Sequence, residues 1–189
     1  MPHGLPLFFR RLRALLAATL LLAVSQAWAD AYSEVRQLVS AGQLEQALGR
    51  ADQYLAGQPR DPQMRFLRGV ILTQSGRTPE AIGAFERLTQ DYPELPEPYN
   101  NLAVLYAQQN ELDKARTALE MAVRTNPGYA VAHENLGDIY VRMAGQSYGR
   151  AAQVDPAAAA TVAPKLALVR ELLEPRKAPS RRPAAPPRN

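Results

Sequence analysis

The sequence repeats itself every 34 residues, and this repetition limits the possible folds more than any other feature. Prolines recur at this interval at positions 59, 93 and 127. Five further columns keep the same register: Ala47, Ala81 and Ala115; Gly42, Gly76 and Asn110; Leu38, Leu72 and Tyr106; Ala51, Phe85 and Leu119; and Val35, Gly69, Ala103 and Gly137. Six columns in one register are hard to obtain by chance, so the chain is predicted to consist of successive copies of one structural unit.

Each unit is predicted to contain two amphipathic helices joined by a short turn. In residues 98–127 the apolar residues share one face of a first helix and, beyond Asn110, one face of a second helix. Asn110 can adopt the left-handed conformation that ends a helix, as can Gly42 and Gly76 in their copies. The proline after each second helix prevents that helix from continuing. Because one helix pair cannot bury its apolar face alone, the pairs are predicted to stack.

This pattern resembles the tetratricopeptide repeat family, whose unit is a helix–turn–helix of 34 residues. In residues 96–129 the pattern of the family falls on Tyr99, Leu102, Ala103, Tyr106, Ala115, Leu119, Ala122 and Pro127. The second copy has Arg68, and the first copy Glu34, where the family expects leucine. The resemblance covers residues 30–156 and implies an all-α protein, a right-handed α-solenoid of about three helix pairs.

The fourth copy lacks the turn between its two helices. Its closing proline, Pro156, comes 29 residues after that of the third copy, and the missing residues fall between Tyr140 and Ala144. The apolar series continues through this gap at helical spacing, so one long fused helix is predicted over residues 131–154, about 36 Å in length at ~1.5 Å per residue. The alternative is a break at Gly145, which would leave a second helix too short to pack well.

A last helix is predicted at residues 157–174. Its buried stripe is expected to consist of Leu166, Val169, Leu172 and Leu173. This helix is expected to cap the apolar face that the last repeat would otherwise expose. Pro164 either kinks the helix or marks its first turn.

Residues 1–29 are typical of a secretory signal peptide. A basic start is followed by an apolar run of about eleven residues and by a small-x-small motif that ends at Ala29. The run is shorter than the ~20 residues of a membrane-spanning helix, and the alternative is an uncleaved anchor or an interfacial helix. Cleavage is expected after Ala29. The mature protein is therefore expected to be exported, in the first place to the periplasm.

The remainder divides into a repeat domain and a tail. The repeat domain is predicted at residues 30–174, with copies at 30–61, 62–95, 96–129 and, in degenerate form, 130–156, followed by the capping helix. The tail at residues 175–189 has no apolar periodicity and is predicted to be disordered. Of the 22 Lys and Arg, three precede residue 30 and five lie in the tail, whereas all 18 Asp and Glu lie between. The repeat domain therefore has a net charge of −4.

Composition excludes several kinds of site. The chain has no cysteine, which rules out thiol catalysis, disulfides and thiolate metal sites. His133 has no second histidine nearby, so packing at the edge of the core is favoured over metal binding. No phosphate-binding glycine loop, Ser/His/Asp arrangement or paired carboxylates can be identified. No catalytic residue, metal or cofactor is predicted, and we expect a protein that is not an enzyme.

The resemblance implies a concave groove, lined by the first helix of each pair, that binds a peptide or helix of a protein partner. The expected contacts are Phe66, Val70, Asn101, Val104, Gln108, Asn135, Asp138 and Arg142. Asn101 and Asn135 lie one repeat apart, and their amides are able to pair with a peptide backbone; the alternative is that they satisfy local backbone groups. Phe66 serves either as an aromatic anchor for the partner or as packing at the edge of the core.

Two other functions fit the sequence. The protein would be a structural component if its first, weakly matched repeat formed a homo-oligomer. It would be tethered to the envelope if the basic tail contacted an anionic surface, although a solvated terminus is the simpler interpretation. Nucleic acid is not expected as a partner, because the protein is expected to be exported and because the tail has no aromatic residue for base stacking.

Overall fold

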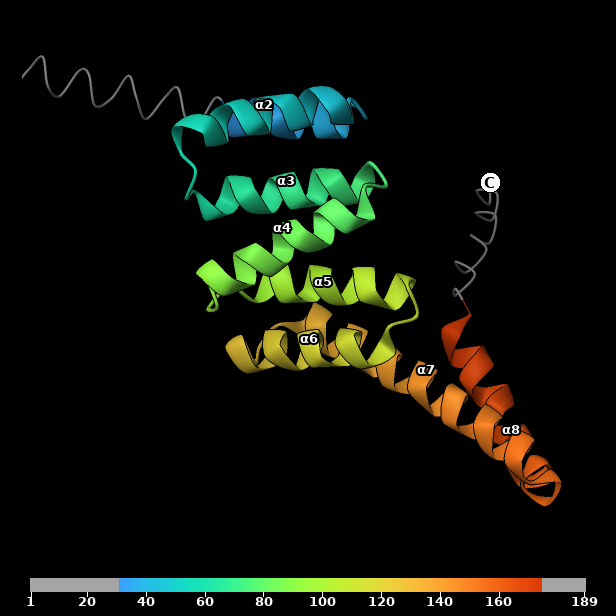
Figure 1. Cartoon of the computed structure of the whole chain (residues 1–189). Helices are drawn as coiled ribbons and strands as arrows, with labels where there is room; N and C mark the ends of the chain where they lie inside the picture. The colour runs from blue at the N-terminus through green and yellow to red at the C-terminus, as the bar shows by residue number, and fades with distance from the viewer. Residues whose placement is uncertain (1–30, 175–189) are drawn as a thin grey trace, which may run out of the picture.

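The computed structural model describes residues 31–174, and all regular structure in this range is α-helical (Figure 1). A helix at residues 31–40 is followed by α2 (Leu44–Gly57), α3 (Pro62–Gln74), α4 (Thr78–Asp91), α5 (Pro96–Gln108), α6 (Leu112–Thr125), α7 (Ala130–Val154) and α8 (Pro156–Leu173). The predicted signal peptide, residues 1–29, and the predicted tail, residues 175–189, lie outside the described residues.

The helices stack in the order of the sequence (Figure 1). Residues 31–40 pair with α2 through the Tyr32–Tyr54 ring contact and the Glu34–Arg50 ion pair. Helix α3 pairs with α4 and α5 with α6, each pair packs against the next, and α5 also contacts α7. This arrangement confirms the predicted all-α solenoid of three helix pairs, a long helix and a C-terminal helix. The first helices of the pairs therefore lie in one layer and the second helices in another.

Three equivalent turns join the helices within the pairs. Gly42, Gly76 and Asn110 have φ angles of 72°, 71° and 59°, which confirms the predicted left-handed conformation. The next residue in each turn donates its backbone N–H to the carbonyl five residues earlier, as Glu111 does to Tyr106 at 2.9 Å. This is the bonding pattern by which a left-handed residue closes a helix end.

Two repeat columns share the space between the helices of a pair. Their members, all buried, are Val35 with Ala51, Gly69 with Phe85, and Ala103 with Leu119. A Cβ atom added to Gly69 would lie 2.6 Å from Cε1 of Phe85, so only glycine fits beneath this ring. A larger side chain in one column is thus matched by a smaller one in the other, which keeps the helix spacing constant.

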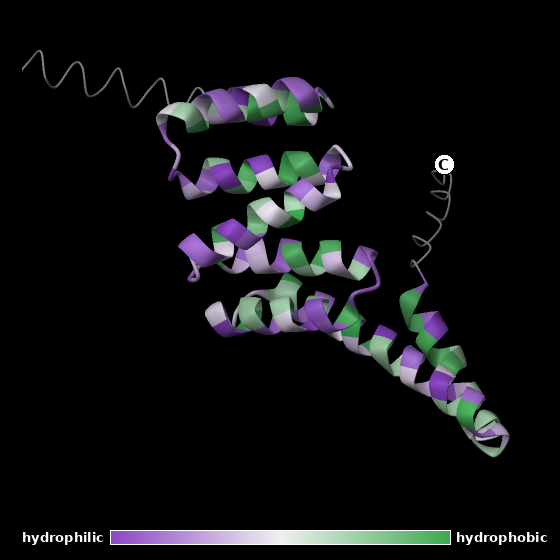
Figure 2. Ribbon diagram, in the orientation of Figure 1, coloured by the Kyte–Doolittle hydropathy of each residue, from purple (hydrophilic) through white to green (hydrophobic). Residues whose placement is uncertain are grey.

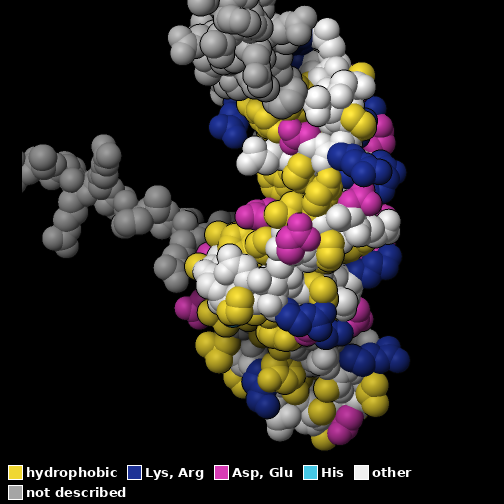
Figure 3. Space-filling view, turned by 90° about the vertical axis from the view of Figure 1, so that its left-hand side faces the viewer, with side chains coloured by type: hydrophobic (Ala, Val, Ile, Leu, Met, Phe, Trp, Pro, Cys, Tyr) yellow, Lys and Arg dark blue, Asp and Glu magenta, His cyan; other side chains and the backbone are white. Residues whose placement is uncertain are grey.

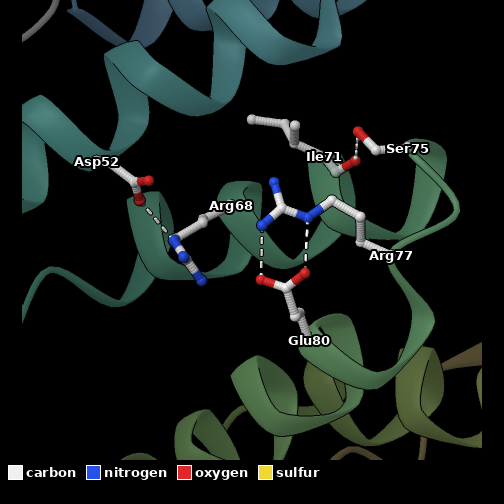
Figure 4. Close-up of polar contacts among 6 residues, drawn as sticks. All are labelled: Asp52, Arg68, Ile71, Ser75, Arg77 and Glu80. Carbon is white, nitrogen blue, oxygen red and sulfur yellow. Dashed lines mark hydrogen bonds and ion pairs between the residues drawn. The ribbon is translucent and has the colours of Figure 1, made fainter.

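Glu34 and Arg68, which stand where the family expects leucine, form ion pairs with α2. We call these positions, with Leu102 of the third copy, the leucine column. Nε of Arg68 lies 2.6 Å from Oδ1 of Asp52 (Figure 4), and Glu34 pairs with Arg50 at 2.5 Å. The leucine of the third copy, Leu102, is instead 5% exposed. The first two copies therefore replace an apolar contact with charged pairs at the surface of α2.

The fourth copy consists of α7 alone. This helix is continuous from Ala130 to Val154, which confirms the fused helix and excludes a break at Gly145. Because no second helix follows in this copy, the face of α7 that such a helix would cover is open. A Cβ atom added to Gly137 would meet nothing within 4 Å, and Tyr140 is 49% exposed.

The last helix, α8, turns back along the distal half of α7 and forms a hairpin that projects from the stack (Figure 1). Pro156 is its first residue, so Pro164 lies in its interior. The predicted stripe is wrong for Leu172 and Leu173, which are 68% and 40% exposed. Among the helices of residues 31–174, α8 packs closely against α7 alone, so its other faces keep hydrophobic residues at the surface (Figure 2).

Candidate interaction groove

A mainly apolar hollow of about 610 Å³ opens beside the first helices of the first three repeats. We call it the N-terminal hollow. Its walls include Tyr32 from the first helix, Phe66 and Val70 from α3, and Pro98 from α5, while Glu97 also lines it. Two of the eight predicted contact residues, Phe66 and Val70, are thus brought together here.

Phe66 packs at the edge of the core and at the same time faces the N-terminal hollow. Its ring packs against the buried ring of Phe85, with centroids 5.7 Å apart and planes inclined by 56°. It is nevertheless only half-buried, and its free side lines the N-terminal hollow. An aromatic side chain fixed on one side by the core can receive an apolar group on the other at little entropic cost.

A cluster that sequence reasoning missed holds Tyr32 in this wall. Tyr32 donates its hydroxyl to Oδ1 of Asp61 at 2.5 Å, and Tyr54 donates to Oδ2 at 2.8 Å. The same carboxylate caps α3 by accepting from the backbone N–H of Met64 at 3.1 Å. The Asp61–Pro62 dipeptide is a helix-start signal, and it could have identified the cap but not the two tyrosines.

These hydrogen bonds determine the protonation of the cluster. Burial tends to raise the pKa of the Asp61 carboxyl, but the bonds from Tyr32, the start of α3 and Tyr54 hold that pKa below its ordinary value. Burial, and then the neighbouring carboxylate, raise the pKa of Tyr32. Asp61 is therefore ionised and both tyrosines are neutral donors at neutral pH.

A second hollow of about 390 Å³ lies between α5 and α7, and we call it the C-terminal hollow. Five predicted contact residues line it: Val104, Gln108, Asn135, Asp138 and Arg142. Leu173 also lines it, because α8 returns the chain to this point. Sequence reasoning missed Leu173, since the return of α8 depends on the hairpin and not on the repeat register.

Two polar contacts across the C-terminal hollow tie α7 to α5. Asn135 donates its side-chain amide to Oδ1 of Asn100 at 2.8 Å, and Asn100 is only 7% exposed. Arg142 donates Nη2–H to the backbone carbonyl of Ala107 at 2.9 Å. Both polar groups thus already have partners within the chain, and each of them helps to fix the spacing between the two helices.

Asn101, the remaining predicted contact residue, lines neither hollow. Its side-chain amide donates to the backbone carbonyl of Glu97, one turn earlier in α5, at 2.9 Å. Asn101 and Asn135 therefore do not form equivalent rungs in this structure: one bonds to its own helix and the other to the neighbouring helix. Local satisfaction, the alternative that the sequence left open, describes Asn101.

Charged side chains of both signs lie on the first helices without an ion pair among the described residues: Arg36, which lines the N-terminal hollow, Arg142 and Arg150 are the cations, and three acids accompany them. Among the described residues, Glu97, Glu134 and Asp138 enter no ion pair, whereas Arg65 pairs with Asp91 at 2.7 Å. Glu134 and Asp138 are exposed and lie one turn apart on α7. In the view of the stack from its side, most of the visible Lys and Arg lie toward the right-hand edge, and hydrophobic side chains, with some acidic ones, spread over the rest (Figure 3).

No metal site or membrane span is found in residues 31–174. No group of three or more His, Asp or Glu in this range is arranged to hold a metal ion. His133 is exposed rather than packed at the edge of the core, and its Nε2 lies 2.9 Å from the carbonyl of Pro127. No helix in the same range is long and apolar enough to cross a membrane.

Comparison with known proteins identifies the repeats. Two family models, both described as tetratricopeptide repeat, match residues 32–96 and 72–136. PYG7, a chloroplastic tetratricopeptide repeat domain-containing protein of Arabidopsis thaliana, is 42% identical over 57 residues, which make up 30% of this chain. YvcD of Bacillus subtilis, a protein containing the same repeat, is 38% identical over 69 residues, or 36% of this chain. The matches span only 19% and 14% of these relatives.

Solved structures share the fold. One of them is SycD, a type III secretion chaperone of Yersinia enterocolitica that was solved with a peptide of the translocator YopD. It gives a TM-score of 0.58 at 16% identity, and the match covers 62% of this chain and 95% of SycD. YrrB, described as having an unusual peptide-binding site, gives a TM-score of 0.52 at 26% identity, over 55% of this chain and 54% of YrrB. With two family models covering residues 32–136 and the stacked helix pairs described above, this chain belongs to the tetratricopeptide repeat family.

Proposed function

We propose that this protein is a protein-interaction module that binds a peptide or a short helix of a protein partner in the groove of its first helices. The observation that carries the proposal is the pair of hollows on this one layer of helices, of about 610 and 390 Å³. Both volumes lie within the ~300–1,000 Å³ typical of ligand sites. The peptide complexes of its structural neighbours support the proposal by analogy of fold.

The two hollows differ in the chemistry that they offer. The N-terminal hollow presents Tyr32, Phe66 and Val70, so it suits a large apolar side chain of the partner. The C-terminal hollow combines Val104 with Asp138 and Arg142. Arg142 already donates to the carbonyl of Ala107, so Asp138 is the group that offers an acceptor to an N–H donor of the partner. A partner segment with an apolar anchor at one end and a cationic or amide group at the other matches both.

Selection from a displayed random-peptide library, with the full chain as bait, tests the proposal. Selected peptides should bind Phe66→Ala and Val104→Asp variants about tenfold more weakly or worse, since each change removes an apolar contact surface or places a charge in it. The matched control is Thr117→Ala, at an exposed position on the second helix α6, which should bind as the wild type does. Equal binding by all three variants would reject the groove.

Stability has to be measured beside binding, because Phe66 also packs on Phe85. Thermal unfolding of each variant separates the two effects: a variant that remains folded at the assay temperature and still loses the peptide reports on the groove. Val104 is 38% exposed, so Val104→Asp is expected to unfold at nearly the wild-type temperature.

The proposal includes an exported setting, which the order of basic, apolar and small residues in residues 1–29 supports. Amino-terminal sequencing of the protein purified from its own cells provides the test. A mature chain that begins at Asp30 is expected. A chain that retains the apolar run would reject cleavage after Ala29.

A further inference from the structure

The hairpin of α7 and α8 brings the chain back to the groove just before its basic segment begins. Leu173 is the last residue of α8 and lines the C-terminal hollow. The segment at residues 175–189 starts two positions later and contains Arg176, Lys177, Arg181, Arg182 and Arg188. It contains no acidic residue. A strongly cationic segment thus starts at the edge of a hollow of this same chain.

The hollow presents charge of the opposite sign. Asp138 lines it, and Glu134 lies one turn earlier on α7, and neither carboxylate enters an ion pair among the described residues. Arg142 in the same wall donates to the carbonyl of Ala107 but keeps its positive charge, so Asp138, Glu134 and Arg142 together carry a net charge of −1. The repeat domain as a whole carries a net charge of −4 against +5 on the segment. The repeat domain and the segment therefore attract each other when their charges lie within about one Debye length, ~8 Å at physiological salt.

The segment is long enough to reach these carboxylates. Arg176 and Lys177 follow Leu173 by three and four positions, which corresponds to about 10–14 Å of extended chain. The prolines between the basic residues favour an extended conformation of ~3.1 Å per residue, so little conformational entropy is lost when the segment lies along a groove. Covalent attachment also gives it an effective concentration of about millimolar at the hollow.

We propose that residues 175–189 dock in the C-terminal hollow of their own chain, with basic side chains on Asp138 and Glu134. The docked segment covers Val104 and Asn135 and excludes other ligands from this half of the groove. A partner has to displace it, which raises the affinity that the partner needs and sets the salt dependence of binding. The inference concerns the same groove as the proposed function but requires no partner, so it is tested without one.

Paramagnetic relaxation in the full chain provides the test. Because the chain has no cysteine, Ser180→Cys offers a single site for a nitroxide label. At about 50 mM NaCl the backbone amide signals of Val104, Asn135 and Asp138 should fall to roughly half or less of their intensity in the reduced, diamagnetic sample. At about 1 M NaCl, where the Debye length is ~3 Å, they should recover. Full intensity at low salt, or equal loss over all helices, would overturn the proposal.

Charge variants and a mixed sample distinguish docking in the same chain from other contacts. The double variant Asp138→Asn/Glu134→Gln should restore the signals about twofold, whereas Asp113→Asn, an exposed acid on α6, should change nothing. Loss of signal in an isotope-labelled chain without nitroxide, mixed with nitroxide-labelled chains, would assign the contact to a second copy and overturn docking in the same chain. A groove that binds library peptides but shows no relaxation effect would reject this inference alone.

Discussion

Gly69 lies directly beneath the ring of Phe85: a Cβ atom at Gly69 would stand 2.6 Å from Cε1 and 2.7 Å from Cζ of that ring. At the equivalent positions one repeat later the sequence has Ala103 and Leu119, and both side chains are buried. The spacing of the two helices in a pair therefore depends on the combined volume of the two side chains at these positions and not on either residue alone. This relationship leads to two predictions about stability.

Gly69→Ala should destabilise the protein although alanine favours helix. The clash with the Phe85 ring should cost about 1–3 kcal/mol of the free energy of unfolding, more than the about 0.5–1 kcal/mol gained from helix propensity. Gly137→Ala is the matched control, because nothing lies within 4 Å of a Cβ atom there, and it should stabilise. Urea unfolding measures both. A change of the same sign in the two variants would refute the packing argument.

Phe85→Leu should rescue Gly69→Ala. The double variant copies the Ala103–Leu119 pair of the third repeat, in which both residues are buried. We expect it to recover about half or more of the loss, because coupled neighbours are not additive and the smaller side chain removes the clash. The test is a double-mutant cycle on the free energy of unfolding. Additive losses would show that the two columns do not share space.

Asp61 should give the stability of the N-terminal repeats a dependence on pH. Its folded-state pKa lies below the ordinary value of ~3.9, so the stabilisation is present above that value and is lost as the pH falls through the folded-state pKa. At neutral pH, Asp61→Ala should cost about 1–2 kcal/mol, because it removes the cap of α3 and leaves two tyrosine hydroxyls without their acceptor.

Urea unfolding of wild type and Asp61→Asn at neutral pH and at about pH 3 tests this dependence, because asparagine can still cap the helix but carries no charge. The difference in stability between the two proteins should shrink in acid. A difference that is constant, or that grows as the pH falls, would contradict the role assigned to Asp61.

Arg68→Leu should be tolerated. The ion pair with Asp52 is exposed enough for its coupling to be about 0.2–1 kcal/mol, and leucine restores the apolar residue of this column. We expect the free energy of unfolding to stay within about 0.5 kcal/mol of wild type or to rise. The reciprocal change Leu102→Arg, at a position 5% exposed, should cost about 2 kcal/mol or more. Thermal unfolding that ranks the two in the opposite order would exclude this account of the leucine column.

Asn135→Ala should destabilise the protein, whereas Asn101→Ala should not. Without Asn135, Oδ1 of the buried Asn100 loses its donor, at a cost of about 1–3 kcal/mol. Asn101 bonds only to its own helix, so its loss should stay within about 0.5 kcal/mol. Equal effects in urea unfolding would contradict the distinction. Asn135 is for the same reason a poor choice for testing partner binding.

The helices and their order follow from the sequence because the repeat columns record local rules. Gly42, Gly76 and Asn110 mark turns that need a left-handed residue, and the gap after Tyr140 removes the turn from the fourth copy. Such signals depend on neighbours in the chain. The same register also assigns residues to the first helices, so seven of the eight predicted contact residues line the two hollows.

Features that depend on contacts between distant residues could not be predicted from the sequence. The exposure of Leu172 and the position of Leu173 at the groove follow from the way α8 folds back on α7. The bond from Asn135 to Asn100, rather than to Asn101, depends on how α5 and α7 are rotated toward each other. Amphipathic spacing indicates which face of a helix is apolar, but not which neighbour covers it.

Cross-linking from single cysteines tests most directly the claim that the first helices carry the binding surface. A photoreactive group would be placed in the full chain at Val70→Cys or Val104→Cys in the groove, or at Thr117→Cys on α6, with a library-selected peptide as the target. The account predicts cross-links from the two groove positions and none from α6. Cross-links mainly from Thr117→Cys would place the binding surface on the second helices and contradict it.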